Sequence, residues 1–266
     1  MSDHVLGGVT TAPPAGGFDR WLGAAWRQFR LECRMFWRNP SAAFFGVLLP
    51  LLLLAVFGAV FSDRPHDLRV IVPGIAGMSV MSATFTSLAY NLTTLRERGI
   101  LKRLRGTPLA PSAYLTGLAA SAVANAALQL ALVIAAGHWV FGVGWPRDWG
   151  ALAVFAALGV VCFAALGVAL SHAIPNPESA PAYVNAVFLP QILIAGVFYD
   201  EKSAPAAIRD IAQALPLKHL VDGFSGAMVN GAGLAAHGTA LVALGLWTAV
   251  GVALAVRGFS WEGRGD

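Results

Sequence analysis

Long apolar stretches without charged residues dominate this sequence. Stretches free of Asp, Glu, Lys and Arg run through 39–62, 70–95, 106–146, 149–177, 179–199 and 223–256. A membrane-crossing helix needs about 20 mostly apolar residues, so each stretch is long enough to span. The pattern predicts an all-α integral membrane protein with six transmembrane helices, near 41–61, 71–94, 112–138, 150–172, 180–199 and 235–256. Counts of five or seven also fit the pattern.

The segment before the first span is predicted to lie along the membrane surface. With about 100° per helical residue, four arginines form one stripe and six mostly apolar residues lie opposite: Arg20, Arg27, Arg34 and Arg38 against Leu22, Trp26, Phe29, Cys33, Phe36 and Trp37. A basic face opposite an aromatic one is typical of an interfacial amphipathic helix. A plain basic anchor beside the membrane is the alternative.

These patterns divide the chain into four parts. We expect a disordered cytoplasmic tail (1–19), an interfacial amphipathic helix (20–38), a single six-span transmembrane domain (39–257) and a cytoplasmic tail (258–266).

The distribution of Lys and Arg predicts the orientation. With the N-terminus inside, the inner segments hold twelve of the 18 basic residues, and the six outer ones are diluted by acids. Basic residues favour the cytoplasmic side. The sequence therefore predicts a multi-pass protein of the cell inner (plasma) membrane with both termini in the cytoplasm. Trp139, Trp145 and Trp149 then form an outer aromatic belt.

Composition agrees with lipid as the solvent. The chain is 57% hydrophobic and 12% charged, whereas a soluble domain carries about 25% charged residues. The net charge of +4 does not indicate nucleic acid, because the basic residues flank apolar stretches. Cys33 and Cys162 fit neither a disulfide framework nor a metal site.

The loop between the second and third predicted spans carries the densest charge. Residues 96–105 hold five basic residues and one acid, and Pro108 and Pro111 end the segment. Ile100, Leu101 and Leu104 share one helical edge, so a short amphipathic helix is predicted, suited to docking on a cytosolic protein. Charges that only enforce topology are the alternative reading.

Four strings, in order, resemble type-2 ABC exporter permeases, a family that includes drug-resistance, lipid and polysaccharide exporters. They are Arg38-Asn39-Pro40 before Leu49-Pro50-Leu51-Leu52, then Val72-Pro73-Gly74-Ile75, then Tyr90-Asn91-Leu92 with 96–109, and finally Leu215-Pro216-Leu217-Lys218-His219-Leu220-Val221-Asp222. The resemblance covers the chain from about Trp21 to Arg257.

The resemblance implies an export subunit without catalytic activity of its own. The loop becomes a coupling helix on a separate cytosolic ATP-binding subunit, through Arg96, Glu97, Arg98, Gly99, Leu101, Lys102, Arg103, Leu104 and Arg105. Two such ATPases would work with two permease subunits, forming a homodimer or a heterodimer. The chain has no phosphate-binding loop of the G-x-x-x-x-G-K-[ST] type. It is therefore expected to need no cofactor, with ATP and Mg held by the partner. The expected cargo is an amphipathic drug, lipid or glycolipid-like compound, as in antibiotic efflux.

Polar residues inside the predicted spans are candidates for a substrate route, because such residues are costly in lipid and tend to face cavities. They are Ser79, Ser82, Thr86, Tyr90 and Thr93 in the second span and Tyr183, Asn185 and Gln191 in the fifth. Helix–helix packing through small and hydroxyl residues is the alternative explanation.

Two other functions remain open from the sequence. A secondary transporter would also suit six spans with a polar route. An intramembrane serine protease would use Ser225, in the string Gly223-Phe224-Ser225-Gly226, with His138 or His237. The protease requires the serine and a histidine to meet from different helices.

The segment 200–233 is predicted to be an outer helical hairpin rather than a seventh span. It carries seven charged residues, and one charge at mid-bilayer costs about 2.5–3.5 kcal/mol on insertion scales. Two short helices broken at Pro216 fit the pattern. In the second, an apolar face is formed by Leu217, Leu220, Val221, Phe224 and Met228, with Lys218, Asp222 and Ser225 pointing elsewhere.

This topology predicts the labelling of two single cysteines. In a background lacking Cys33 and Cys162, cysteines placed at Lys202 and Asn230 should both react with an impermeant thiol reagent on intact cells. Labelling of the Asn230 position only after the membrane is opened would mean that the segment crosses.

Overall fold

The computed structural model describes residues 17–40, 44–61, 65–100, 111–199, 204–231 and 233–258. Every regular element in these ranges is a helix, and they contain no strand. In chain order the α-helices are α1 (Gly17–Arg38), α3 (Leu49–Val60), α4 (Pro65–Met81), α5 (Ser87–Glu97), α7 (Pro111–Phe141), α8 (Trp149–Ala173), α9 (Ala180–Ile194), α10 (Ala206–Gln213), α11 (Pro216–Ser225) and α12 (Gly238–Gly258). Short π-helical segments, η1 (Phe44–Leu48), η2 (Ser82–Thr86) and η4 (Gly226–Asn230), and a 3₁₀ turn, η5 (Leu234–His237), join them. Most of both predicted tails lies outside the described residues.

Four helical stretches are long and apolar enough to cross a membrane: Asp67–Glu97, Ser112–Phe141, Trp149–Ala173 and Leu234–Arg257. The first of them joins α4, η2 and α5 into one continuous helix. The predicted first and fifth spans correspond to shorter apolar helices, Gly46–Val60 and Ala180–Ile194. The all-α membrane fold is therefore confirmed, while the count of six spans stays a prediction.

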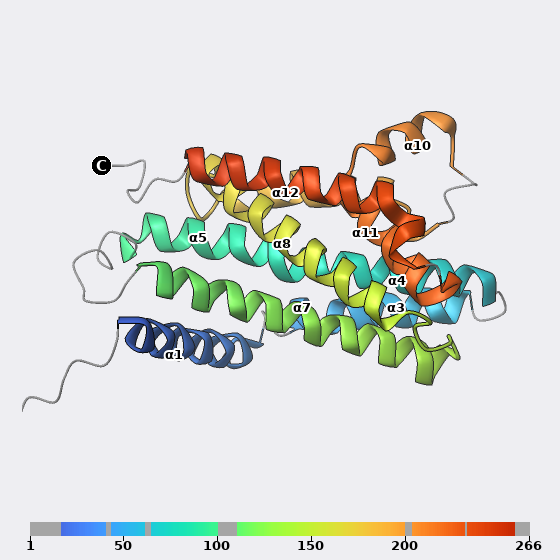
Figure 1. Ribbon diagram of the computed structural model, residues 1–266, viewed down its shortest axis with the longest axis horizontal. Coiled ribbons are helices and arrows are strands. Elements are labelled where there is room, and N and C mark those ends of the chain that lie inside the picture. The colour runs from blue at the N-terminus through green and yellow to red at the C-terminus, as the bar shows by residue number, and fades with distance from the viewer. Residues whose placement is uncertain are drawn as a thin grey trace, which may run out of the picture.

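The long helices run alongside one another and change direction at each connection (Figure 1). One end of the bundle, the α1 end, holds α1, the ends of α5, α8 and α12, and the beginnings of α7 and α9. The other end, the hairpin end, holds α10, α11, the end of α3, the beginning of α4 and the connection after α7. Arg98, directly after α5, and Arg257, in the last turn of α12, thus belong to the α1 end.

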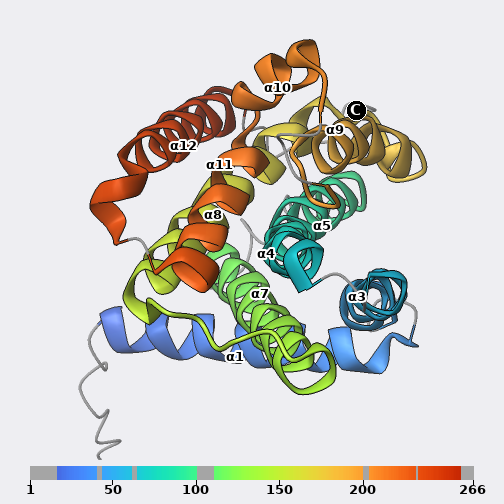
Figure 2. The same cartoon turned by 90° about the vertical axis from the view of Figure 1, so that its right-hand side faces the viewer.

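Helix α1 crosses the bundle rather than joining it, as Figure 2 shows. It packs on the beginning of α7 through Ala24, Ala25 and Ala113, where Gly117 leaves room for the carbonyl of Ala25. Leu22, Trp26 and Trp37 stay exposed. A helix across the bundle with exposed aromatic residues has the geometry of an interfacial helix.

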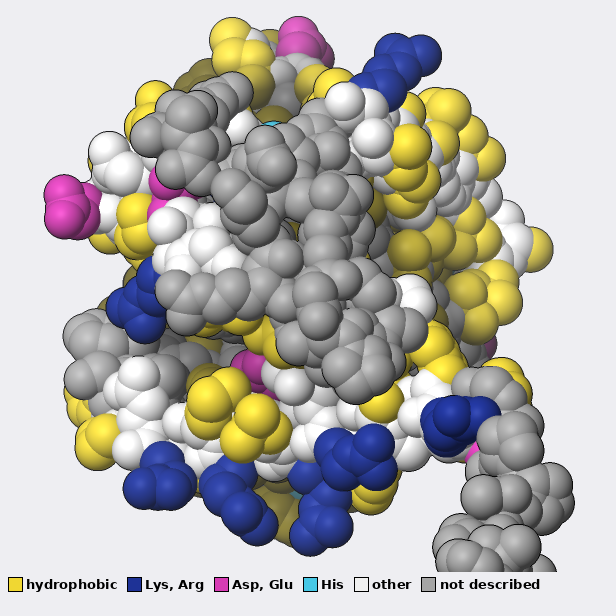
Figure 3. Space-filling model, turned by 90° about the vertical axis from the view of Figure 1, so that its left-hand side faces the viewer, with side chains coloured by type: hydrophobic (Ala, Val, Ile, Leu, Met, Phe, Trp, Pro, Cys, Tyr) yellow, Lys and Arg dark blue, Asp and Glu magenta, His cyan; other side chains and the backbone are white. Residues whose placement is uncertain are grey.

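Arginines of α1 give the α1 end its positive charge. Seen from this end, Lys and Arg side chains form a row along the edge where α1 lies (Figure 3). Arg27, Arg30 and Arg34 border a shallow groove of about 300 Å³ together with Leu31. Such a row suits the anionic surface of an inner leaflet.

Helix α11 lies inside the bundle, between α4, α8 and α12 (Figure 2). Its predicted apolar face is buried: Leu217, Leu220, Val221, Phe224 and Met228 are at most 5% exposed. The break between α10 and α11 falls at Pro216, as the pattern predicted.

Lys218 differs from its prediction. The sequence pattern placed it on a face pointing away from the packed side, but the side chain is buried with the rest of α11. Its ammonium donates to both carboxylate oxygens of Asp222 at 2.6 Å, one helical turn later. A buried cation is tolerated when a hydrogen-bonded carboxylate neutralises it, and the i, i+4 spacing provides that partner within the helix.

Gly74 explains one of the family-like strings in the sequence. A Cβ added at this position of α4 would lie 2.1 Å from the carbonyl oxygen of Val197, in the chain after α9. The missing side chain therefore lets the end of the α9 segment press against α4.

A methyl group at Gly74 should separate these two segments. Overpacking costs about 1–3 kcal/mol, so Gly74→Ala should lower the melting temperature by several degrees and reduce the folded yield. Gly245→Ala, in α12 with open space at the Cβ position, is the matched control and should be harmless. Equal melting curves for both variants would contradict the close approach.

Glu32 makes the docking of α1 dependent on pH. Its carboxylate accepts a 2.6 Å hydrogen bond from Gln28 Nε2. Burial raises the pKa of the Glu32 carboxyl above its ordinary 4.5, and the Gln28 bond offsets this only in part. A raised pKa means that the docked state binds the proton more tightly than the undocked state. The protonated Glu32 carboxyl therefore favours docked α1 at low pH. This contribution is lost as the pH rises through the pKa that Glu32 has in the docked state.

Glu32→Gln should remove the cost of the buried charge. We expect slower amide exchange in α1 of the variant than of wild type near neutral pH, and similar exchange where the wild-type carboxyl is protonated, below about pH 4. Asp19→Asn, on an exposed part of α1, is the control. Its amide exchange in α1 should match that of wild type both near neutral pH and below about pH 4. Faster exchange in Glu32→Gln at neutral pH would contradict the pKa shift.

Candidate functional site

The predicted coupling residues begin where α5 ends, and the structure separates them into two groups. Arg96, Glu97, Arg98 and Gly99 are described. The rest of the predicted coupling helix, Leu101, Lys102, Arg103, Leu104 and Arg105, lies outside the described residues. Arg98 is exposed, whereas Arg96 is only 3% exposed. Arg96 therefore faces the protein interior and not a partner.

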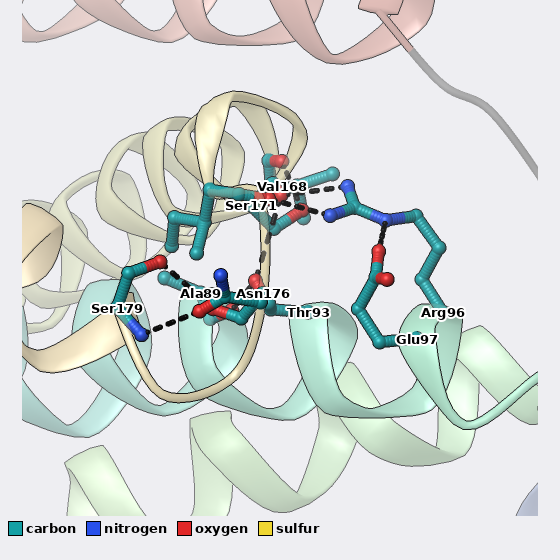
Figure 4. Close-up of polar contacts among 9 residues, drawn as sticks. Ala89, Thr93, Arg96, Glu97, Val168, Ser171, Asn176 and Ser179 are labelled. Carbon is teal, nitrogen blue, oxygen red and sulfur yellow. Dashed lines mark hydrogen bonds and ion pairs between the residues drawn. The ribbon is translucent and has the colours of Figure 1, made fainter. Parts of the chain in front are cut away.

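Arg96 binds the C-terminal end of α8, as Figure 4 shows. Its two terminal nitrogens donate to the carbonyls of Ser171 and Ile174 at 2.8 and 2.6 Å. The last carbonyls of a helix have no partner within the helix, and a cation there also opposes the negative end of the helix dipole. The guanidinium thus takes the place of a C-cap. We call Arg96, Glu97, Ser171 and Ile174 the clasp.

Glu97 balances the buried charge of Arg96. Its carboxylate accepts from Arg96 Nε at 2.8 Å, so three nitrogens of one guanidinium bind three oxygens. Charge-assisted hydrogen bonds of this kind are stronger than neutral ones. The fixed fork geometry of arginine allows this arrangement, which a lysine would not reproduce.

The clasp continues into the turn between α8 and α9 (Figure 4). Three residues before Arg96, the Thr93 hydroxyl donates to Ala89 O at 2.8 Å and lies 3.5 Å from Ser171 O. After the clasp, Asn176 Oδ1 accepts from Ser179 N at 2.8 Å, just before α9 begins. The base of the basic loop is therefore connected to the end of α8 and the start of α9.

The predicted substrate-route residues differ in burial and in hydrogen bonding. Ser79 and Thr93 are buried and donate to carbonyls one turn back in their own helix. Ser82, Thr86 and Tyr90 are half-buried, and Tyr183 and Asn185 are exposed on α9. Gln191 is 6% exposed, and its Oε1 has no hydrogen-bond partner. Among these eight residues, Gln191 has a buried polar atom without a hydrogen-bond partner.

A cavity of about 710 Å³ lies beside Gln191. We call it the α9 cavity. Its wall comes from η2, α8, α9, the start of α11 and α12, and includes Phe85, Leu170, His172, Gln191, Pro216 and Trp247. The volume is in the range of small-molecule sites. Of the predicted route residues, Gln191 alone belongs to its wall.

The sequence contained local signals for two contacts that we did not predict, those of Trp247 and Arg96. Trp247 lies in the middle of a candidate span, far from the interfaces that tryptophans favour. Its ring N–H donates to Ala214 O at 3.1 Å, at the break before α11. Arg96 lies in the last turn of α5, three residues after Thr93, which is where an arginine can turn back into the protein.

The described residues show no hydrogen-bonded serine–histidine pair for the protease alternative. Ser225 ends α11, and among the described residues no hydrogen bond joins it to a histidine. His237 Nε2 is buried without a partner and lies over Gly226. Among the described residues there is also no cluster of three metal-ligating side chains.

Comparison with known proteins identifies the family. A profile described as ABC-2 type transporter matches residues 23–229. The chain is 23% identical over 159 residues to the linearmycin resistance permease protein LnrN of Bacillus subtilis, covering 59% of this chain and 41% of LnrN. It is 24% identical over 199 residues to the putative transport permease ycf38 of Pyropia yezoensis (70% of this chain, 67% of that protein). It is 24% identical over 155 residues to the probable multidrug ABC transporter permease YbhR of Escherichia coli (57% and 41%).

These matches agree with the four strings and with the all-α membrane fold. The chain spans less than half the length of LnrN and of YbhR, but the family profile covers most of the chain itself. The chain therefore belongs to the ABC-2 type transporter family, as a multi-pass membrane permease.

Proposed function

We propose that this chain is the membrane-spanning subunit of an ATP-binding-cassette exporter. It moves an amphipathic drug, lipid or glycolipid-like compound out of the cytoplasm. Two such subunits, identical or different, work with two cytosolic ATP-binding subunits, which hold ATP and Mg. Support comes from the family and from relatives named as resistance and multidrug permeases.

In this proposal the α1 end faces the cytoplasm. Support comes from the charge distribution, because the inner segments hold twelve of the 18 basic residues. The arginines of α1, Arg98 after α5 and Arg257 in α12 share that end of the bundle. The hairpin end then faces outward.

The clasp is the observation that carries the coupling mechanism. Arg98 and the basic residues after it contact the ATPase, while Arg96 holds the base of the same loop to the end of α8. A displacement of the loop therefore pulls on Ser171 and Ile174, and through the Asn176–Ser179 turn on α9. In this way a movement at the α1 end reaches the helix that carries Gln191.

A secondary transporter is the second candidate, and one observation disfavours it. A proton relay needs titratable groups inside the membrane, yet the four candidate spans contain Asp or Glu only at their ends, at Asp67 and Glu97. Transport that survives ATP depletion but stops when the proton gradient is collapsed would favour the secondary transporter.

Changing the exposed loop residues should disrupt assembly. Charge pairs at a desolvated interface contribute above about 1 kcal/mol each. Replacing Arg98, Lys102 and Arg103 together by Ala should leave the chain in the membrane, reduce the ATPase activity that co-purifies with it, and stop export. Arg257→Ala, an exposed arginine at the same end, is the control. Unchanged assembly and export in the triple variant would overturn the coupling assignment.

Arg96→Lys should affect coupling without affecting assembly. A lysine cannot bind both carbonyls and Glu97 at once, and each unpaired buried carbonyl costs about 1–3 kcal/mol. We expect a lower melting temperature and export reduced by at least about tenfold, with co-purifying ATPase as in wild type. Loss of the ATPase from Arg96→Lys would place this residue in the interface instead.

A further inference from the structure

We propose that the α9 cavity is a binding site, within a single subunit, for an uncharged, mostly apolar molecule that carries a hydroxyl or amide N–H. The molecule enters from the membrane between α9 and α12. This inference rests on the proposed export function only for the role of the molecule as cargo. The binding itself is a property of this chain.

The first argument is the buried amide of Gln191. Leaving a buried polar atom without a hydrogen bond costs about 1–3 kcal/mol, and such atoms are uncommon in proteins. Gln191 Oε1 has no partner although its side chain is 94% buried, that is, 6% exposed. The residue belongs to the wall of a cavity large enough for a small molecule. An unpartnered acceptor in a cavity wall fits a ligand that donates a hydrogen bond.

A second acceptor follows from the neighbouring proline. Pro190 lies inside α9 and has no amide N–H, so the helical donor to the carbonyl of Ala186, four residues earlier, is missing. Ala186 and Pro190 also belong to the cavity wall. The part of α9 that lines the cavity therefore lacks one backbone donor next to the unpartnered Gln191 Oε1.

The remainder of the wall defines the chemistry of the ligand. It is built from Leu, Ala, Val, Phe and Trp side chains, with His172 from α8, and none of the residues that line it is Asp, Glu, Lys or Arg. A charged group would have no counter-charge there, and burying one in an apolar site is costly. The ligand is therefore neutral in the part that enters.

The shape of the cavity indicates the direction of entry. Ala173, Ala186, Pro190 and Leu254, from α8, α9 and α12, form an exposed rim. Phe85 and Gln191 lie at the buried side. Helix α9 packs against α5, α10 and α11, and the cavity separates it from α8 and α12. A molecule dissolved in the bilayer therefore passes the rim and meets the amide at the inner wall.

Trp247 provides the readout, because it belongs to the cavity wall and bromine quenches indole fluorescence on contact. The purified chain, in lipid nanodiscs without any ATPase, is titrated with three dibrominated octadecyl probes. They are the alcohol, its methyl ether and the sulfate ester. The part of the quenching that is lost in Trp247→Phe reports the probe bound in the α9 cavity.

We expect saturable quenching by the alcohol, about tenfold weaker binding of the ether, which lacks the donor, and no saturable binding of the sulfate. Gln191→Leu should lower the affinity for the alcohol about tenfold and leave the affinity for the ether unchanged. Gln129→Leu is the matched control, since Gln129 is also buried with an unpartnered Oε1 but lies on α7. It should bind as wild type does. Ala186→Phe, at the rim, should weaken all binding.

Equal, non-saturable quenching by the alcohol and the ether would mean ordinary lipid contact and would overturn the proposal. Equal effects of Gln191→Leu and Gln129→Leu on the affinity for the alcohol would also overturn it. Absence of Trp247-dependent quenching in wild type, as when a second copy of the chain covers the rim, would overturn it as well. Export of the alcohol by the complete transporter is measured separately. Binding without ATP-dependent export overturns the proposed function and leaves the site standing, whereas export without binding overturns the site.

Discussion

Backbone groups inside a membrane need partners within the protein, and this constraint shapes three helix ends in the described bundle. Where α8 stops, Arg96 binds the carbonyls of Ser171 and Ile174. Where the chain breaks before α11, Trp247 binds the carbonyl of Ala214. Beside α11, the carbonyl of Ala227 accepts from the amides before α8. At these three interruptions, specific side-chain or backbone donors satisfy the carbonyls and hold the neighbouring helices in position.

The clasp links this constraint to the proposed coupling. Arg96 stabilises α8 because its charge is buried, hydrogen-bonded and balanced by Glu97. The same contacts prevent the base of the basic loop from moving independently of α8. A residue that completes a helix end can therefore also transmit a displacement, since both roles need a rigid, fully bonded guanidinium. Arg98, two residues further on, is exposed and free of this structural role.

The α9 cavity is the place where the constraint is left unmet. Pro190 removes a backbone donor from α9, and Gln191 Oε1 has no partner. Helix α9 is also short: its 15 residues extend over about 22 Å, less than a hydrocarbon core of about 30 Å. Its contacts with α5 and α11 hold one side of the helix, and the cavity borders the other. A helix held in this way can respond to a pull from the α8–α9 turn.

The sequence by itself determined the membrane class, the helical fold and the break at Pro216, because apolar length, charge and proline act locally along the chain. It also identified the family, through four short strings in order. The tertiary structure decided where polar side chains point. Arg96 appeared as one of several loop cations, and only the position of α8 buries it. Lys218 was expected outside the packed face, yet α4, α8 and α12 pack around α11 and bury this side chain. Gln191 was one of eight polar candidates, and the α9 cavity singles it out. Burial depends on neighbours distant in sequence, which residue spacing along one helix does not specify.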